Sequence, residues 1–177
     1  QLPHLEITRE LARRFNTLYG KEVFPVPEPL LTEFPRLPGL DGKRMSKSLG
    51  NAILISDPPD VIAKKISTAI TDPEKIHMGD AGHPDICNIY AYQRRFNEKA
   101  VAEIRSTCVA GTRGCVACKK EAAKVISEFL APIRERRSRY EADRDGVMAM
   151  LKAGAEQARE TARATMIDVR QAMGFER

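Results

Sequence analysis

Apolar residues recur at roughly helical spacing over residues 4–19, with charged residues on the other faces. Gly20 follows directly and is a natural end for such a helix. Residues 21–40 then carry five prolines, which lack a backbone donor and resist both helices and central strands. This pattern predicts one helix followed by an extended loop, with room for short strands at residues 23–24 and 30–31.

A short apolar run at residues 52–55 is typical of a strand, since two of its residues are β-branched. Residues 56–58, Ser-Asp-Pro, then signal the start of a helix, because a capping residue precedes a proline. This helix is expected to leave Lys64 and Lys65 outside and to end at residues 71–73. The apolar stripe that it would bury consists of Val61, Ile62, Ile66 and Ile70.

From about residue 83 the periodicity is helical almost throughout. We expect helices at 83–97, 98–106 and 116–140, with Pro132 kinking or interrupting the third. A fourth helix starts at Asp143 or Asp145 and closes at Gly174. Its predicted core stripe is Val147, Leu151, Ala155, Ala158, Ala162, Met166, Val169 and Met173.

The two parts of the chain differ in character and predict two domains. A strand, a helix and a glycine-containing basic loop are typical of the last piece of an α/β nucleotide-binding domain. We therefore expect a mainly α chain. Residues 1–75 would be the carboxyl-terminal part of a Rossmann-type domain, and residues 76–177 an α-helical bundle.

Residues 40–51 form the basic loop, in which Gly42 and Gly50 enclose three cations and two hydroxyls. Glycine lets backbone amides approach a ligand, amides and hydroxyls donate hydrogen bonds, and cations neutralise phosphate charge. The composition suits a polyphosphate, although a solvated basic turn has the same composition. The P-loop pattern G-x-x-x-x-G-K-[ST] does not occur in the chain. The polar residues between the two glycines are Lys43, Arg44, Ser46, Lys47 and Ser48.

Four cysteines lie within 32 residues in the pattern C-x20-C-x6-C-x2-C, and none lies elsewhere. An even number of cysteines also permits disulfides, but in an intracellular enzyme the cysteines would stay reduced. Four thiolates at irregular spacing suit an iron–sulfur cluster. Zinc sites more often use two C-x-x-C pairs, and this chain has one. The third alternative is that the four cysteines bind no metal. The cysteines are Cys87, Cys108, Cys115 and Cys118.

The composition and charge of the chain are compatible with both a binding role and a catalytic role. The chain has 177 residues, is 42% hydrophobic and 30% charged, and has the composition of an ordinary soluble protein. Its net charge of +5 and its pI near 9.1 suit a polyanionic partner. No run of about eighteen apolar residues is present, so we expect no membrane association.

The string Arg44 to Ser48 resembles the KMSKS signature of class I aminoacyl-tRNA synthetases, with Arg in place of the first Lys. Arg keeps the charge and can bind two phosphate oxygens. Residues 63–73 and 154–175 are similar to the tail of bacterial tryptophanyl-tRNA synthetases. Residues 1–6 resemble the end of another synthetase motif, Gly-x-Asp-Gln followed by a helix that begins His-Leu-Glu. Gln1 matches the Gln of that motif, and His4 to Glu6 match the start of the helix. The HIGH signature and the amino-acid pocket lie upstream in the family, so this chain alone is expected to be inactive.

The resemblance implies that tryptophan and ATP form an adenylate, from which the acyl group passes to tRNA(Trp) in a cytoplasmic, homodimeric enzyme. Lys47 would be the main stabiliser of the leaving pyrophosphate, assisted by Arg44. Mg²⁺ would accompany the ATP, and residues 76–177 would bind the anticodon. The other nucleotide-binding residues that it implies are Gln1, Leu37, Met45, Ser46 and Ser48.

Some tryptophanyl-tRNA synthetases hold a [4Fe-4S] cluster in a C-x22-C-x6-C-x2-C motif, and the first gap here is two residues shorter. The resemblance implies this subgroup, with zinc as the alternative metal. Two other function classes stay open: a non-enzymatic nucleic-acid-binding module with a four-cysteine metal site, and another class I synthetase such as the tyrosyl enzyme. Nearby basic residues would offset the charge of a cluster and face RNA phosphates. They are Arg113, Lys119, Lys120 and Lys124.

Overall fold

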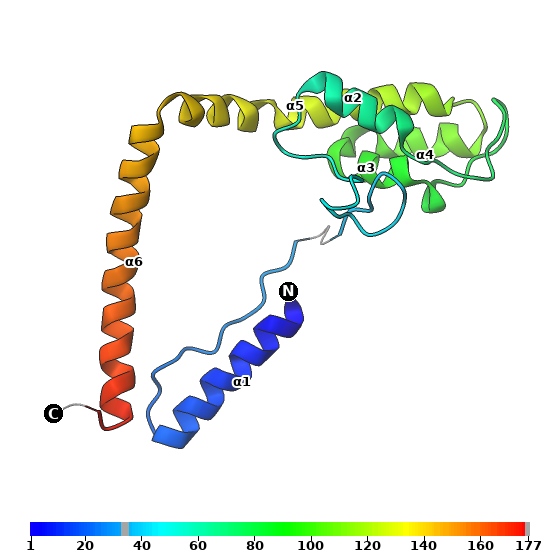
Figure 1. Ribbon diagram of the computed structural model, residues 1–177. Coiled ribbons are helices and arrows are strands. Elements are labelled where there is room, and N and C mark those ends of the chain that lie inside the picture. The colour runs from blue at the N-terminus through cyan, green and yellow to red at the C-terminus, as the bar shows by residue number, and fades with distance from the viewer. Residues whose placement is uncertain (33–35, 176–177) are drawn as a thin grey trace. The chain divides into compact units, whose positions relative to one another are not determined.

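The computed structural model describes residues 1–32 and 36–175. It divides into two compact units, one of residues 1–32 with 140–177 and one of residues 33–139. Both are helical (Figure 1), as the apolar periodicity predicts. No helix in the described ranges is long and apolar enough to cross a membrane. The functional boundary that the sequence suggests after residue 75 stays a prediction.

Helix α1 (Leu2–Tyr19) opens the first unit and confirms the helix predicted at residues 4–19. Gly20 ends it with a φ of 63°, a left-handed conformation that glycine adopts without strain. Of the proline-rich loop that follows, Pro35 lies outside the described residues.

The segment after α1 turns back onto the helix. The ring of Phe24 lies 4.9 Å from that of Phe15. Asn16 Oδ1 accepts hydrogen bonds from the backbone N–H groups of Val23 and Phe24, both at 3.0 Å. A side chain thus takes the place of a neighbouring strand, and no strand forms at residues 23–24 or 30–31.

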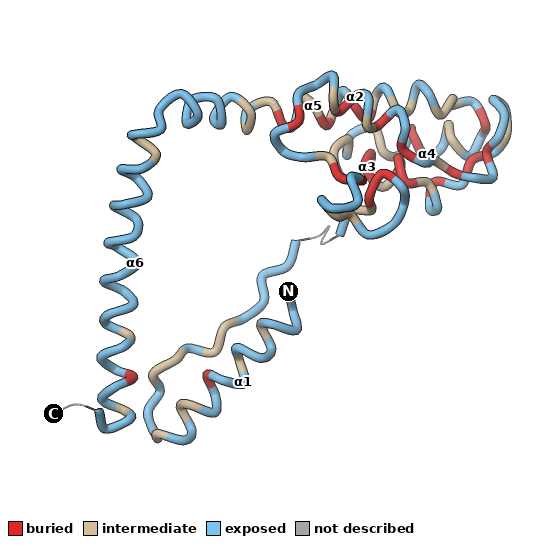
Figure 2. Tube along the Cα trace, viewed as in Figure 1, coloured by how far each residue is buried: buried red, intermediate tan, exposed pale blue. Residues whose placement is uncertain are grey.

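Helix α6 (Arg144–Ala172) completes the first unit. Asp143 caps it as predicted, because its carboxylate accepts a hydrogen bond from Gly146 N at 2.8 Å. The predicted core stripe is wrong for most of the helix, since Leu151 is 62% exposed and Val169 is the one residue of α6 that is buried. Figure 2 shows the same pattern along the helix. A helical stripe is buried only where another element covers it.

The described residues of the second unit form four α-helices and two short 3-10 turns. The predicted helix at 83–97 is divided at Cys87, and the predicted third helix continues through Pro132 without interruption. The elements are α2 (Pro59–Thr68), η1 (Pro84–Ile86), α3 (Asn88–Phe96), η2 (Glu98–Ala100), α4 (Val101–Val109) and most of α5 (Cys115–Ala142).

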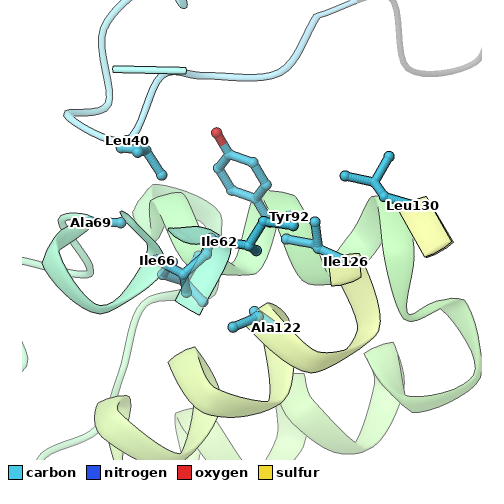
Figure 3. Packing of buried hydrophobic residues seen from close by; sticks show 10 residues of the cluster. Leu40, Ile62, Ile66, Ala69, Tyr92, Ala122, Ile126 and Leu130 are labelled. Carbon is cyan, nitrogen blue, oxygen red and sulfur yellow. The ribbon is translucent and has the colours of Figure 1, made fainter. Parts of the chain in front are cut away.

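Apolar side chains from α2, α3 and α5 form the core of the second unit (Figure 3). Tyr92 of α3 lies among them, and its hydroxyl points toward the segment that carries Leu40. The core thereby joins the basic loop to the helices. Its members are Leu40, Ile62, Ile66, Ala69, Ile89, Tyr92, Ala122, Ala123, Ile126 and Leu130.

Residues 52–55 form no strand, so that prediction is wrong. Leu54 N donates to Asp57 Oδ2 at 2.8 Å, and Lys65 Nζ donates to Ala52 O at 2.9 Å. Lys65 also pairs with Asp57 at 2.6 Å instead of facing solvent as expected. These side chains satisfy backbone groups that a neighbouring strand would otherwise bind. In the described part of the chain, β pairing is limited to one isolated bridge.

Replacing Ile62 tests the assigned core. Ile62 is 0% exposed, and Ile62→Ala should lower the free energy of unfolding of the second unit by about 2–5 kcal/mol, because it leaves a cavity. Ile76→Ala is the matched control: Ile76 is 77% exposed, and its loss should change the stability by less than ~0.5 kcal/mol. Urea unfolding followed by circular dichroism measures both. Equal losses would contradict this core.

Candidate functional site

The basic loop is a closed turn whose ends are hydrogen-bonded to each other. Pro38 and Arg44 form the isolated antiparallel bridge. Leu40 N donates to Asn51 O at 2.8 Å. Gly42 has a φ of 74°, and a Cβ there would lie 2.8 Å from a side chain of the segment after α2. The turn therefore requires glycine at this position.

Asn51 is buried at the centre of the loop and binds both of its sides. Its Oδ1 accepts from Ser46 N at 2.8 Å. Its Nδ2 donates to Asp41 Oδ1 at 2.8 Å and to Arg44 O at 3.1 Å. The hydrogen bond from Asn51 holds the pKa of the Asp41 carboxyl below its usual value. The sequence places Asn51 at the end of the basic loop, but it does not indicate which groups its amide binds.

Two side chains of α3 hold the start of the loop by hydrogen bonds, and the sequence did not indicate either of them as part of the site. Asn88 Nδ2 donates to Gly39 O at 2.8 Å, and the Tyr92 hydroxyl donates to Pro38 O at 2.6 Å. Burial raises the pKa of Tyr92 to about 12, so the phenol stays protonated and remains a donor at neutral pH. No local pattern around residues 88–92 points to these long-range bonds.

The signature residues divide into one anchor and several exposed groups. Met45 packs against the core, whereas the cations of the loop are exposed. Ser46 Oγ and Ser48 Oγ share a hydrogen bond at 2.8 Å. Within the described part of the chain, the cationic side chains of the loop make no hydrogen bond or ion pair. These cations are Lys43, Arg44 and Lys47.

Of the two other residues predicted at the nucleotide, Leu37 lies half-buried directly before Pro38, beside the signature. Gln1 lies at the start of α1, where its carbonyl accepts from His4 N and Leu5 N, both at 3.1 Å. Gln1 belongs to the first unit, and its contact with a nucleotide stays a prediction.

The structure brings the four cysteines together around one cavity of about 20 Å³ in the second unit. They come from separate elements: one precedes α3, one lies near the end of α4, and two lie on the first turn of α5. None is in a disulfide. The cysteines are Cys87, Cys108, Cys115 and Cys118.

The surroundings of the cavity set the state of its thiols. Burial raises the pKa of the Cys108 thiol and that of the Cys118 thiol. Hydrogen bonding from Gln93 and Arg113 lowers the pKa of the Cys118 thiol and so partly offsets the effect of burial. A Cβ on Gly82 would lie 2.5 Å from Cys108 Sγ, so a glycine there leaves room for the sulfur.

The donor set has the chemistry of a metal site, but not the geometry of a single ion. Zinc needs its sulfur ligands about 2.3 Å from one point. Among the described residues, no three His, Cys, Asp or Glu side chains are placed to hold one metal ion. The four thiols line one shared cavity.

A groove of about 600 Å³ lies between α2 and α5 and is bordered by Lys119, Lys120 and Lys124. Lys119 Nζ donates to Ser67 O at 3.0 Å, which holds that side chain across the groove. Arg113, which sequence proximity groups with these lysines, instead lines the cysteine cavity. The basic cluster predicted from the sequence thus separates into a lysine-bordered groove and one half-buried arginine at the cysteine cavity.

Comparison with known families decides the class of the protein. Residues 1–131 match the family described as tRNA synthetases class I (W and Y). The chain belongs to this family. The prediction of a class I synthetase domain, made from residues 44–48, is therefore confirmed.

Within this family, the chain is similar to tryptophan–tRNA ligases. The tryptophan–tRNA ligase of Aquifex aeolicus is 47% identical over 177 residues, which cover 99% of this chain and 45% of the relative. That of Thermotoga maritima is 40% identical, covering 99% of this chain and 54% of the relative. The chain thus spans about half the length of the curated relatives that it matches.

Solved structures give the same result for the synthetase fold. The tryptophanyl-tRNA synthetase of Campylobacter jejuni, complexed with ADP and tryptophan, aligns with a TM-score of 0.75 at 27% identity. The alignment covers 97% of this chain and 53% of the other. The enzyme of Aeropyrum pernix aligns with a TM-score of 0.61 at 32% identity, over 80% of this chain and 38% of the other.

Removing the amide of Asn51 tests the architecture of the loop. Asn51→Ala should lower the free energy of unfolding of the second unit by about 1–3 kcal/mol, because buried hydrogen-bonding groups lose their partner. The amide of Ser46 should exchange with deuterium faster, by about tenfold. Leu49→Ala is the control, since Leu49 is 64% exposed in the same loop. Unchanged exchange at Ser46 would contradict the assigned role of Asn51.

Proposed function

We propose that this chain is part of a tryptophan–tRNA ligase, which activates tryptophan with ATP and transfers it to tRNA(Trp). The observation that carries the proposal is the signature loop of residues 44–48, with Met45 packed against the core and the cations exposed. The tryptophan–tRNA ligases similar to the whole chain favour tryptophan over tyrosine as the amino acid. A cytoplasmic homodimer that uses ATP with Mg²⁺ is part of the same proposal.

In this reaction the carboxylate of tryptophan attacks the α-phosphate of ATP, the bond to the β-phosphate breaks, and pyrophosphate leaves. No protein nucleophile is needed, so positioning and charge stabilisation provide the catalysis. Lys47 would stabilise the charge that develops on the pyrophosphate, and Arg44 would bind the same phosphates. Because neither side chain has a partner in the described part of the chain, both can turn to the nucleotide without breaking a bond.

The remaining residues would shape the nucleotide site. The backbone amides and hydroxyls of Met45, Ser46 and Ser48 would surround the phosphates, and the backbone near Leu37 would contact the adenine. Gln1 is the remaining residue that we propose for nucleotide binding. The bridge at Pro38 and the hydrogen bonds of Asn51 would keep this loop in shape between turnovers.

Lys47→Ala in the complete synthetase should slow adenylate formation by on the order of a hundredfold, as the loss of one transition-state donor does. Tryptophan binding should hardly change. Pyrophosphate exchange measures the first quantity, and equilibrium dialysis with labelled tryptophan the second. Lys43→Ala is the matched control, because Lys43 is an exposed lysine of the same loop outside the signature. Normal exchange in the Lys47 variant would reject the assignment.

For the cysteine cavity we propose a [4Fe-4S] cluster bound by Cys87, Cys108, Cys115 and Cys118. Four thiolates are the ordinary ligands of such a cluster. Its cube of iron and sulfide holds thiolates further apart than one zinc ion does. The buried Nε of Arg113 has no hydrogen-bond partner and would find a sulfur acceptor there. The cluster would be structural: it would pin the loop between Cys108 and Cys115.

The lysine-bordered groove would bind RNA phosphates beside the anticodon, whose unpaired bases are read by stacking and edge hydrogen bonds. Because α5 carries both the groove lysines and two of the cysteines, the cluster would position these contacts. The bundle of residues 76–177 would in this way act as the anticodon-binding domain.

Cys115→Ser in the complete synthetase should bleach the protein and raise the KM for tRNA, while tryptophan activation stays largely intact. Iron and sulfide analysis, visible absorption and aminoacylation kinetics measure these effects. A colourless wild-type protein with stoichiometric zinc would reject the cluster and keep a metal site. An unchanged KM for tRNA in a bleached variant would reject the link to the anticodon.

A further inference from the structure

We propose that Lys75 and Arg113 are positioning residues for the group at the cysteine cavity, compensating its negative charge from beside Cys108 and Cys118. This inference rests on the proposed iron–sulfur cluster. It assigns a role to Lys75, which lies twelve residues before the first cysteine and belongs to no motif.

Lys75 is a buried cation that forms no salt bridge in the described part of the chain. It is 8% exposed, although lysine is rarely buried unless it is paired. Its Nζ donates to the carbonyl of Asp80, and it forms no salt bridge with any described carboxylate. The Asp80 carboxylate accepts from Ile76 N at 3.1 Å and from His77 N at 2.6 Å. The hydrogen bond from His77 N and, to a smaller extent, the nearby charge of Lys75 hold the pKa of this carboxyl below its usual value. A buried ammonium bound to a neutral acceptor favours an anion nearby.

Lys75 lines the same cavity as the four cysteines. The buried carboxylate of Asp72 also lines this cavity, but it already accepts hydrogen bonds from Glu74 N at 2.9 Å and His83 N at 2.6 Å. A Cβ on Gly82 would lie 2.5 Å from Cys108 Sγ and 3.3 Å from the Cδ of Lys75, so both side chains meet at this glycine. Gly82 N donates to Cys108 O at 2.9 Å, which fixes the loop of Lys75 against the end of α4. A group bound to Cys108 would therefore lie beside the ammonium.

Arg113 approaches from another side of the cavity. It forms an ion pair with Glu121, it lies close enough to the Cys118 thiol to lower the pKa of that group, and its Nε is buried without a hydrogen-bond partner. Glu121 also accepts from Asn97 at 2.9 Å, and Asn97 donates to Gln93 at 3.0 Å. This chain of hydrogen bonds orients the guanidinium toward Cys118.

Gln93 completes the same side with a neutral donor. It is 0% exposed, and its Nε2 donates to Cys118 O at 3.0 Å and lies 3.6 Å from Cys118 Sγ. Asn97 holds the amide in this orientation by donating to Oε1. The cavity thus has donors to sulfur at Cys118 and a cation at Cys108.

These placements have an electrostatic consequence. Four thiolates give the cluster a net negative charge, which grows by one on reduction. Buried cations and hydrogen bonds to sulfur stabilise the reduced form more than the oxidised form. Removing either cation should therefore lower the midpoint potential. The three lysines of the groove border solvent and should contribute less, because water screens their charge.

The test uses the 177-residue chain purified without oxygen. Lys75→Met should lower the equilibrium constant for one-electron reduction about tenfold, ~59 mV in midpoint potential. It should also shorten the lifetime of the visible absorption in air several-fold. Lys75→Arg keeps the charge and should restore most of both values. Lys99→Met is the matched control, since Lys99 is exposed and does not line the cavity.

Arg113→Lys separates charge from hydrogen bonding. It keeps the cation but removes the buried Nε donor, so its potential should fall less than that of Lys75→Met while the cluster still decays faster in air. Far-UV circular dichroism checks that each variant folds. If Lys75→Met loses its helices, Lys75→Gln takes its place.

The outcomes distinguish this inference from the proposal beneath it. Wild-type chain without iron and sulfide overturns the cluster and the inference together. The inference alone is overturned if the wild-type chain holds a cluster and the folded Lys75 variants have the same midpoint potential and the same lifetime in air as the wild type. A fall of the potential in Lys75→Met that Lys75→Arg reverses, with Lys99→Met unchanged, supports it.

Discussion

Burial of Tyr92 against Ile62 and Ile126 is the interaction on which both sites depend, because α3 contributes residues to each. The hydroxyl of Tyr92 holds the signature loop at Pro38, and the next residue, Gln93, donates to Cys118. Consecutive residues of a helix point about 100° apart, so one short helix faces two sites at once. The apolar core therefore fixes the loop and the cysteine cavity in one unit.

Features that depend on local sequence could be predicted. Helices follow from apolar periodicity, and α1, α2, α5 and α6 lie close to where the sequence predicts them. The helix predicted at 98–106 is instead a 3-10 turn, η2, followed by α4 at Val101–Val109. The synthetase class follows from five consecutive residues, since Arg44 to Ser48 form a rare string. The grouping of four cysteines in a short stretch indicated a common site, and the structure places them around one cavity.

Features that depend on distant partners could not be predicted. The run at 52–55 has strand composition, but Asp57 and Lys65 satisfy its backbone, and Lys65 lies on the next helix. Asn88 carries no signal of its own, because its hydrogen bond to Gly39 arises only on folding. The same holds for Lys75, which only folding places at the cavity of the cysteines. The stripe of α6 failed for the opposite reason: periodicity indicates which face is apolar, not whether anything covers it.

The packing of Gly39 against Asn51 restricts which residues can occupy these two positions. A Cβ on Gly39 would overlap the amide of Asn51, so any larger residue at 39 displaces that amide. A smaller residue at 51 would make room but would lose the bonds to Ser46, Asp41 and Arg44. Aspartate keeps the acceptor without the donor, and lysine keeps the donor without the acceptor. The two positions can therefore change only together, and a pair that keeps the loop must still supply one donor and one acceptor in the same small space.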